Sequence, residues 1–213
     1  MIAMVVFDVG ETLVDETRHW SDWADDIRVP RFTFLAALGG VIARGQHHRD
    51  VFRLLIPDFD YEAAHRARLA RGWRYSFEPH DFYPDAIACL RELKARGFRV
   101  GIVGNQHREC EAEFNKLGLV LDLIGSSERW GVEKPLSGFF ARIAQESGLQ
   151  PAQIAYVGDH PVNDVAGAAR AGMVPIFLRR GPWATLHADS PEAAQAKIRL
   201  ENLAELPDRL AVL

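Results

Sequence analysis

The feature that most constrains the fold of this chain is a regular alternation of short apolar runs and amphipathic stretches over residues 85–178. Each apolar run has the length of a strand, and the stretches between them have the apolar spacing of helices. The expected strands are Phe98–Val103, Leu121–Ile124, Ile154–Val157 and Val174–Leu178, and the expected helices are Asp85–Arg96, Arg108–Leu117, Ser137–Ser147 and Asp164–Ala171. Strands joined through helices pair in parallel, so the pattern predicts an α/β fold with helices on both faces of a parallel sheet.

A further apolar run, Ile2–Phe7, precedes this region and suits a strand buried on both faces. Asp8 follows that strand directly, and Gly104–Asn105 and Asp159 each follow another expected strand. Ligands of parallel sheets bind beyond the carboxyl ends of the strands. We therefore expect these residues to gather at one edge of the sheet.

The segment 16–80 has a different character, because it is rich in Trp, Arg, His and Ala and lacks the alternation. It is interrupted at Pro30, and its stretch Tyr61–Trp73 has the spacing of an amphipathic helix. We predict that residues 1–15 and 81–213 form an α/β core domain and that residues 16–80 form a small helical domain inserted into it.

Composition and charge exclude several classes of function. The formal net charge of -4 and the pI near 6.1 do not fit a basic nucleic-acid-binding protein. No apolar run approaches the ~18 residues of a membrane span, and the N-terminus lacks a basic leader. Two cysteines, Cys89 and Cys110, indicate neither a zinc site nor a disulfide framework. We expect a cytoplasmic protein with no nucleic-acid or membrane partner.

Four motifs occur in a fixed order along the chain. They are FDVGETLVD at Phe7–Asp15, IVGN at Ile102–Asn105, EKP at Glu133–Pro135 and VGDHPVNDVAGAARAG at Val157–Gly172. With these motifs the chain resembles the haloacid dehalogenase superfamily of hydrolases over nearly its whole length, most closely in the fourth motif. The resemblance implies a Rossmann-like three-layer core and a helical cap formed by the insertion after the first motif.

The resemblance also implies a catalytic centre. A carboxylate can attack phosphorus and form an acyl phosphate that water then hydrolyses, and Asp8 matches the family's nucleophile. Lys134 matches the lysine that neutralises this carboxylate and the phosphoryl oxygens. Asp8, Asp159, Asp164 and the backbone carbonyl of Gly10 match the ligands of a Mg²⁺ ion, a cation that prefers oxygen.

The resemblance places Gly104, Asn105 and Lys134 at the bound phosphoryl group. Simpler roles stay open for two of the site residues. Asp164 could cap the helix that follows it, and Asn105 could be only a turn residue.

Two positions depart from the family pattern. Family phosphatases have Asp two residues after the nucleophile, where it acts as general acid and base, but this chain has Gly10 there and Glu11 at the next position. The family has Ser or Thr at the end of the second strand, where this chain has Gly104. General acid–base help is worth ~10²–10⁴ in rate, so a substrate with a poor leaving group should react slowly.

These observations support three hypotheses. The first is a Mg²⁺-dependent phosphatase of small phosphomonoesters, acting on a small phosphorylated metabolite as a monomer or homodimer. The second is a binding or regulatory protein that kept the fold and lost efficient catalysis, as Gly10 and Gly104 suggest. The third is a 2-haloacid dehalogenase, which needs no acid at position 10 but has no need of the Asp159 and Asp164 pair.

Overall fold

The computed structural model describes residues 1–212 and divides into two compact units. The core unit comprises Met1–Asp15 and the chain from Phe77 onward, and the inserted unit is Glu16–Ser76. The core unit holds the two ends of the insertion side by side. The Asp15 N–H donates to the Asp81 carbonyl at 2.7 Å, and Val14 forms an antiparallel bridge with Phe82.

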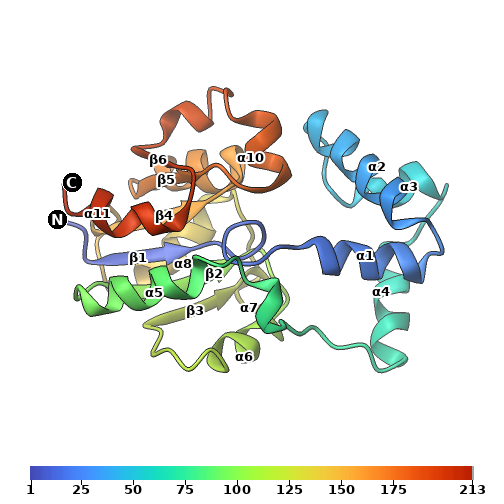
Figure 1. The fold of residues 1–213 in the computed structure, drawn as a ribbon, viewed down its shortest axis with the longest axis horizontal. Coiled ribbons are helices and arrows are strands. Elements are labelled where there is room, and N and C mark those ends of the chain that lie inside the picture. The colour runs from blue at the N-terminus through green and yellow to red at the C-terminus, as the bar shows by residue number, and fades with distance from the viewer. Residues whose placement is uncertain (213) are drawn as a thin grey trace. The chain divides into compact units, whose positions relative to one another are not determined.

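The core unit is built on a six-stranded parallel sheet in the order β3-β2-β1-β4-β5-β6 (Figure 1). The strands are β1 (Met4–Phe7), β2 (Arg99–Gly104), β3 (Leu123–Ser126), β4 (Ile154–Gly158), β5 (Val174–Leu178) and β6 (Ile198–Leu200). The first strand is central, flanked by β2 on one side and β4 on the other. This confirms the predicted parallel α/β sheet, and it puts the end of β1 where the strand order reverses.

Helices cover both faces of the sheet. They are α5 (Ala86–Ala95), α6 (Cys110–Asn115), α7 (Ser127–Trp130), α8 (Ser137–Ser147), α9 (Gly167–Arg170), α10 (Gly181–His187) and α11 (Leu206–Leu210). Right-handed crossovers place α5 and α6 on one face and α8 and α9 on the other. In the part of the chain that the structure describes, no helix has the length and apolar character needed to cross a membrane.

The helical prediction differs from the structure at several places. The expected helix Arg108–Leu117 is shorter, and the helix expected from Asp164 is preceded by helical residues from Pro161 onward. A π-helical segment, Pro161–Ala166, begins there because the ring nitrogen Nδ1 of His160 accepts its first free N–H groups. The helices α7 and α10, the strand β6 and the helices after β6 were not predicted.

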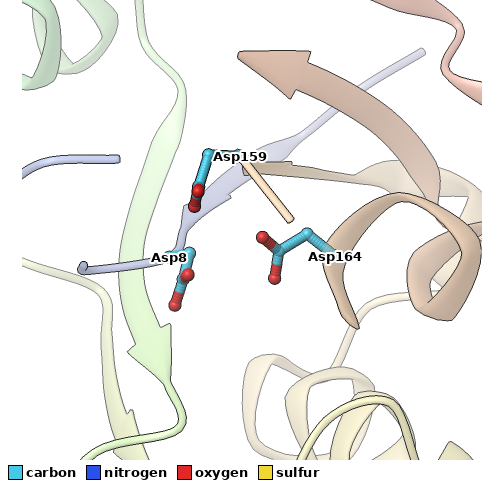
Figure 2. Close-up of side chains that lie close together, drawn as sticks. All are labelled: Asp8, Asp159 and Asp164. Atoms are coloured by element: carbon cyan, nitrogen blue, oxygen red, sulfur yellow. The ribbon is translucent and has the colours of Figure 1, made fainter. Parts of the chain in front are cut away.

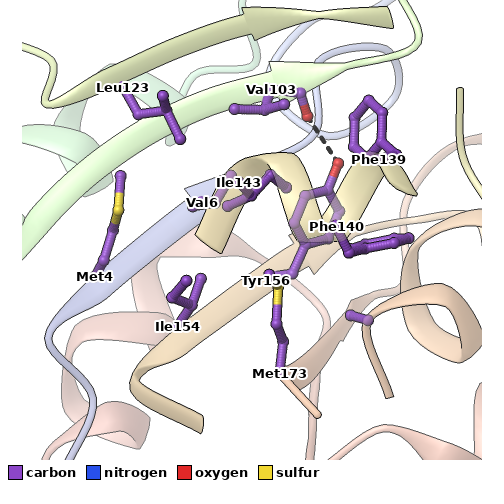
Figure 3. Packing of buried hydrophobic residues seen from close by; sticks show 11 residues of the cluster. Met4, Val6, Val103, Leu123, Phe139, Phe140, Ile143, Ile154, Tyr156 and Met173 are labelled. Atoms are coloured by element: carbon purple, nitrogen blue, oxygen red, sulfur yellow. Dashed lines mark hydrogen bonds between the residues drawn. The ribbon is translucent and has the colours of Figure 1, made fainter. Parts of the chain in front are cut away.

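A large apolar cluster fills the space between the sheet and α8. Met4 and Val6 of β1 face Phe139, Phe140 and Ile143 of α8, all of them buried (Figure 3). The other members of the cluster are Val103, Leu123, Ile154, Tyr156, Ala168 and Met173. Residues alternate across a strand, so Val5 and Phe7 point to the opposite face and β1 is buried on both sides, as its sequence predicts.

The inserted unit is helical and has its own aromatic core. Its helices are α1 (Thr17–Asp26), α2 (Arg31–Ala43), α3 (Asp50–Leu55) and α4 (Tyr61–Ala70). The ring of Phe52 contacts the rings of both Trp23 and Phe34, with centroids 5.0 and 5.5 Å away. The buried guanidinium of Arg68 lies over the rings of both Trp23 and Trp73 and pairs with Asp26.

Candidate active site

Asp8 lies at the carboxyl end of the central strand, directly after β1. Its backbone N–H donates to the Val157 carbonyl of β4 at 2.9 Å, which continues the strand pairing and fixes the residue. Its side chain is nearly buried. Burial raises the pKa of Asp8 to about 6, although the positive charge of Lys134 acts in the opposite direction.

Lys134 lies in the segment before α8, and its side chain reaches the carboxylate of Asp8. Its Nζ lies 2.7 Å from Asp8 Oδ1 and 2.6 Å from Asp164 Oδ1. Burial alone would lower the pKa of this ammonium group, but the two carboxylates outweigh burial and raise the pKa well above its usual value. Lys134 is therefore a fixed positive charge between two carboxylates at neutral pH.

Asp159 follows β4, and Asp164 lies in the π-helical segment that comes next. Both side chains point toward Asp8 (Figure 2). The Thr12 hydroxyl donates to Asp159 Oδ1 at 3.3 Å, and the His160 N–H donates to Asp164 Oδ2 at 2.8 Å. The residue that caps this segment is His160 rather than Asp164, so the simple capping role is wrong for Asp164.

The three carboxylates form a group that fits a divalent metal ion. One oxygen from each of Asp8, Asp159 and Asp164 lies within 4.8 Å of the others, and all three side chains are buried. The buried Oδ2 of Asp159 has no hydrogen-bond partner among the described residues. Burial raises the pKa of Asp159 well above its usual value, and the nearby charges of Asp164, Asp8 and Glu11 add to the effect. An all-oxygen donor set with excess negative charge suits Mg²⁺.

Two glycines leave room for these carboxylates. A Cβ on Gly104 would lie 2.6 Å from Asp8 Oδ1, and a Cβ on Gly158 would overlap the side chain of Asp164. The glycine at position 104 therefore does more than remove a hydroxyl group from the site. Its missing side chain makes the observed position of Asp8 sterically possible.

Asn105 follows Gly104, and its side chain is bonded to the backbone of Lys134. The Lys134 N–H donates to Asn105 Oδ1 at 2.8 Å, and Asn105 Nδ2 donates to the Lys134 carbonyl at 3.1 Å. This residue is therefore more than a turn former. Its amide joins the end of β2 to the segment that carries the site lysine.

The loop after Asp8 has a strained backbone at Glu11. This residue has a φ of 53°, in the left-handed region that costs a side-chain-bearing residue roughly 1–2 kcal/mol. The Glu11 side chain is buried, and its Oε2 accepts the Tyr83 hydroxyl at 2.7 Å. Gly10, beside it, bridges to Val14. The carboxylate of Glu11 is thus hydrogen-bonded to Tyr83, and Gly10, the residue two positions after Asp8, carries no acid group.

Sequence reasoning missed three residues that contact this site: Thr12, Tyr83 and Arg180. Thr12 lies within the first motif, close to Asp8 in the sequence, and this proximity is a signal that could have identified its hydroxyl as a site group. No local pattern distinguishes the other two. Tyr83 reaches the site beside the bridge between Val14 and Phe82, and Arg180 reaches it from the end of β5.

The comparisons with known proteins agree with this geometry. Residues 2–172 match the hydrolase family described as haloacid dehalogenase-like hydrolase. A glyceraldehyde 3-phosphate phosphatase of Methanopyrus kandleri is 38% identical over 105 residues, which are 47% of this chain and 45% of that protein. A phosphoserine phosphatase of Thermus thermophilus is 32% identical over 150 residues, covering 68% of this chain and 57% of that protein.

Among solved structures, the HAD-hydrolase YfnB of Bacillus subtilis, bound to magnesium, covers 98% of both chains with a TM-score of 0.70 and 18% identity. At that identity the likeness shows the fold alone. The chain spans about half the length of the curated relatives that it matches. Since the family match extends over most of the sequence and the fold agrees, the chain belongs to the haloacid dehalogenase-like hydrolases, a family of enzymes.

Proposed function

We propose that this protein is a Mg²⁺-dependent phosphatase of small phosphomonoesters that works through an aspartyl-phosphate on Asp8. The observation that carries the proposal is the buried group in which Lys134 contacts Asp8 and Asp164 while Asp159 faces them. The names of the relatives support it, because they are phosphatases of small phosphorylated compounds.

Four groups would hold the metal ion: the carboxylates of Asp8, Asp159 and Asp164 and the backbone carbonyl of Gly10. The ion would supply positive charge that offsets the repulsion between a carboxylate nucleophile and a phosphate. Thr12 keeps one oxygen of Asp159 oriented, which leaves the unpartnered Oδ2 for the ion.

In the first step a carboxylate oxygen of Asp8 attacks phosphorus, and the bond between phosphorus and the ester oxygen breaks. The leaving oxygen takes the bonding electron pair and collects a proton from solvent. In the second step water hydrolyses the acyl phosphate, releasing inorganic phosphate and regenerating Asp8. Lys134 holds Asp8 Oδ1 in place and offsets charge on the phosphoryl oxygens. The Gly104 and Asn105 segment would bind these oxygens through its backbone.

The leaving group should matter strongly for this site. Gly10 offers no proton, and the Glu11 carboxylate is already paired with the Tyr83 hydroxyl. Phenolate and carboxylate groups leave the phosphorus without protonation, whereas alkoxide groups need a proton. We therefore propose a preference for phosphomonoesters with good leaving groups. In this proposal the inserted unit Glu16–Ser76 serves as the helical cap that the family resemblance implies.

The test is hydrolysis of p-nitrophenyl phosphate with and without Mg²⁺, with Asp8→Asn as the control. We expect Mg²⁺-dependent turnover that Asp8→Asn abolishes, with unchanged circular dichroism. A series of phosphate esters should show rates that fall by about 10²–10⁴ from aryl to alkyl leaving groups. Gly10→Asp should raise the alkyl rate selectively.

Two outcomes would contradict the proposal. Wild-type turnover no greater than that of Asp8→Asn would favour the binding or regulatory alternative, especially if Gly10→Asp created activity. Release of chloride from 2-chloropropionate without added metal would favour the dehalogenase alternative.

A further inference from the structure

The left-handed backbone at Glu11 needs support, because no glycine is present to adopt it freely. The loop has its own hydrogen bonds: the Leu13 and Val14 N–H groups donate to the Val9 carbonyl at 2.9 and 3.0 Å. These bonds close the turn, but they do not hold the Glu11 side chain. That side chain is buried against Gly181, where a Cβ would lie 2.5 Å from Glu11 Cβ.

Tyr83 holds the same loop at two points. Its hydroxyl donates to Glu11 Oε2 at 2.7 Å, and its backbone N–H donates to the Leu13 carbonyl at 3.0 Å. The first contact fixes the Glu11 side chain, and the second fixes the backbone two residues later. Tyr83 therefore restrains the side chain of the left-handed residue Glu11 and the backbone that follows it.

Arg180 joins this contact to the metal side of the site. It follows β5 by two residues, and its guanidinium lies 4.1 Å from the ring centroid of Tyr83. Nη1 donates to the Thr12 carbonyl at 3.0 Å, and Nη2 donates to Asp85 Oδ2 at 2.5 Å. The hydroxyl of the same Thr12 donates to Asp159 Oδ1. A continuous series of contacts thus runs from Arg180 through Thr12 to Asp159.

We propose that Tyr83 and Arg180 are positioning residues that hold the loop Val9–Thr12 in the conformation that orients Asp8, the Gly10 carbonyl and Asp159. Both act through Glu11 and Thr12, and neither needs to touch substrate. The inference rests on the proposed phosphatase function only for its effect on turnover. The hold on the loop is a property of the protein without metal or substrate.

The metal-free test is amide hydrogen exchange, read at the Leu13 and Val14 amides and compared with the Val5 amide of β1. Tyr83→Phe removes one hydroxyl, and Arg180→Lys keeps the charge but cannot make the two guanidinium bonds. Each should speed exchange in the loop about tenfold and leave Val5 unchanged. The matched control is Arg179→Lys, at an exposed neighbour paired with Glu201, which should change neither.

A second background tests the mechanism. Glycine adopts the left-handed conformation without a side chain to restrain it. In Glu11→Gly protein, Tyr83→Phe should therefore change loop exchange by less than about twofold. An equal effect of Tyr83→Phe in both backgrounds would overturn the role assigned to Glu11. Loop exchange in Tyr83→Phe and Arg180→Lys equal to wild type would overturn the inference as a whole.

Turnover supplies the link to function. Tyr83→Phe and Arg180→Lys should each lower kcat for p-nitrophenyl phosphate about tenfold with little change in KM, as loss of an orienting contact does. Faster loop exchange with unchanged kcat would overturn the positioning role. Wild-type protein without turnover would contradict the phosphatase proposal alone, because the exchange experiments would still decide whether these residues hold the loop.

Discussion

Among single residues, Gly104 best illustrates how a departure from the family pattern can be a packing requirement. The sequence alone suggests a lost hydroxyl, and the structure adds that a Cβ would lie 2.6 Å from Asp8 Oδ1. Asp8 and residue 104 therefore constrain each other. With Lys134 at 2.7 Å from the same oxygen, the Asp8 side chain has little freedom to move aside.

We expect Gly104→Ala to displace Asp8 and lower kcat by about 10²-fold, since small misplacements of a reacting group are costly. Overpacking should also reduce the free energy of unfolding by about 1–3 kcal/mol. Steady-state kinetics and urea unfolding measure the two effects.

The control for this change is Gly138→Ala, which adds the same methyl group in α8 at 3.4 Å from Val132 Cγ2. It should leave kcat unchanged and keep or slightly raise stability, because alanine favours helix. Normal activity of Gly104→Ala would show that the Asp8 side chain can occupy a second position.

Among the site residues that sequence reasoning found, Asp8, Gly104 and Asp159 lie at the ends of apolar strands, whereas Lys134 and Asp164 were named from their motifs. Asp8, Asp159 and Asp164 belong to short motifs whose strand can be read locally, and the parallel sheet brings them together. Tyr83 and Arg180 could not be found in this way. Their contacts with Glu11 and Thr12 depend on tertiary structure, and the Arg180 contact joins residues 168 positions apart.

At the level of elements, the strands with clear apolar runs were predictable, whereas the short strand β6 was not. Apart from the first residues of β2 and β5, the residues of β1, β2, β4 and β5 are buried, and hydrophobic burial is what their sequences encode. The strand β6 has three residues, one of them an exposed arginine, so it has too little pattern to read. The early start at Pro161 depends on the His160 side chain, a contact that no periodicity contains.

Two elements of the site are joined by one side chain. Asn105, after β2, makes two hydrogen bonds with the backbone of Lys134, before α8. Since β2 belongs to the sheet and α8 to a helical layer, the asparagine aligns the segment of Lys134 with the end of β2. This role requires both the oxygen and the nitrogen of the side-chain amide.

We expect Asn105→Ala to weaken inhibition by orthovanadate about tenfold, which corresponds to the loss of one or two hydrogen bonds of about 1 kcal/mol each. The inhibition constant at fixed Mg²⁺ is the measurement. Asn115→Ala is the matched control, because this exposed asparagine donates to a carbonyl of its own helix, that of Glu111. Equal inhibition of the two variants would argue against the alignment.

For the whole molecule, the crowding of carboxylates has a consequence for stability. The folded-state pKa of Asp8 is raised to about 6 by burial, and the pKa of Asp159 is raised in the same direction. An acid with a raised folded-state pKa binds its proton more tightly in the folded state. Its contribution to stability therefore falls as pH rises through the interval between the unfolded-state and folded-state pKa values.

We predict that these groups destabilise the metal-free protein as pH rises from about 4 to above 6, and that Mg²⁺ offsets the loss. The increase in melting temperature on replacing EDTA with Mg²⁺ should be larger at pH 8 than at pH 5. Thermal unfolding at the two pH values measures it.

Asp159→Asn is the control, because a neutral amide needs no counter-ion. Its Mg²⁺-induced shift should be small at both pH values. A wild-type shift that is equal at the two pH values, or larger at pH 5, would contradict the assignment of the metal site.

The insertion begins and ends at neighbouring points of the core unit, where Asp15 bonds to Asp81 and Val14 pairs with Phe82. Because the core itself holds these ends together, the chain between them behaves as a closed loop. Doubling the length of such a loop costs only about 0.6 kcal/mol of closure entropy. Mutations that lengthen, shorten or replace the insertion are therefore cheap for the core, so selection can vary the insertion while the carboxylate chemistry at the end of β1 stays constant.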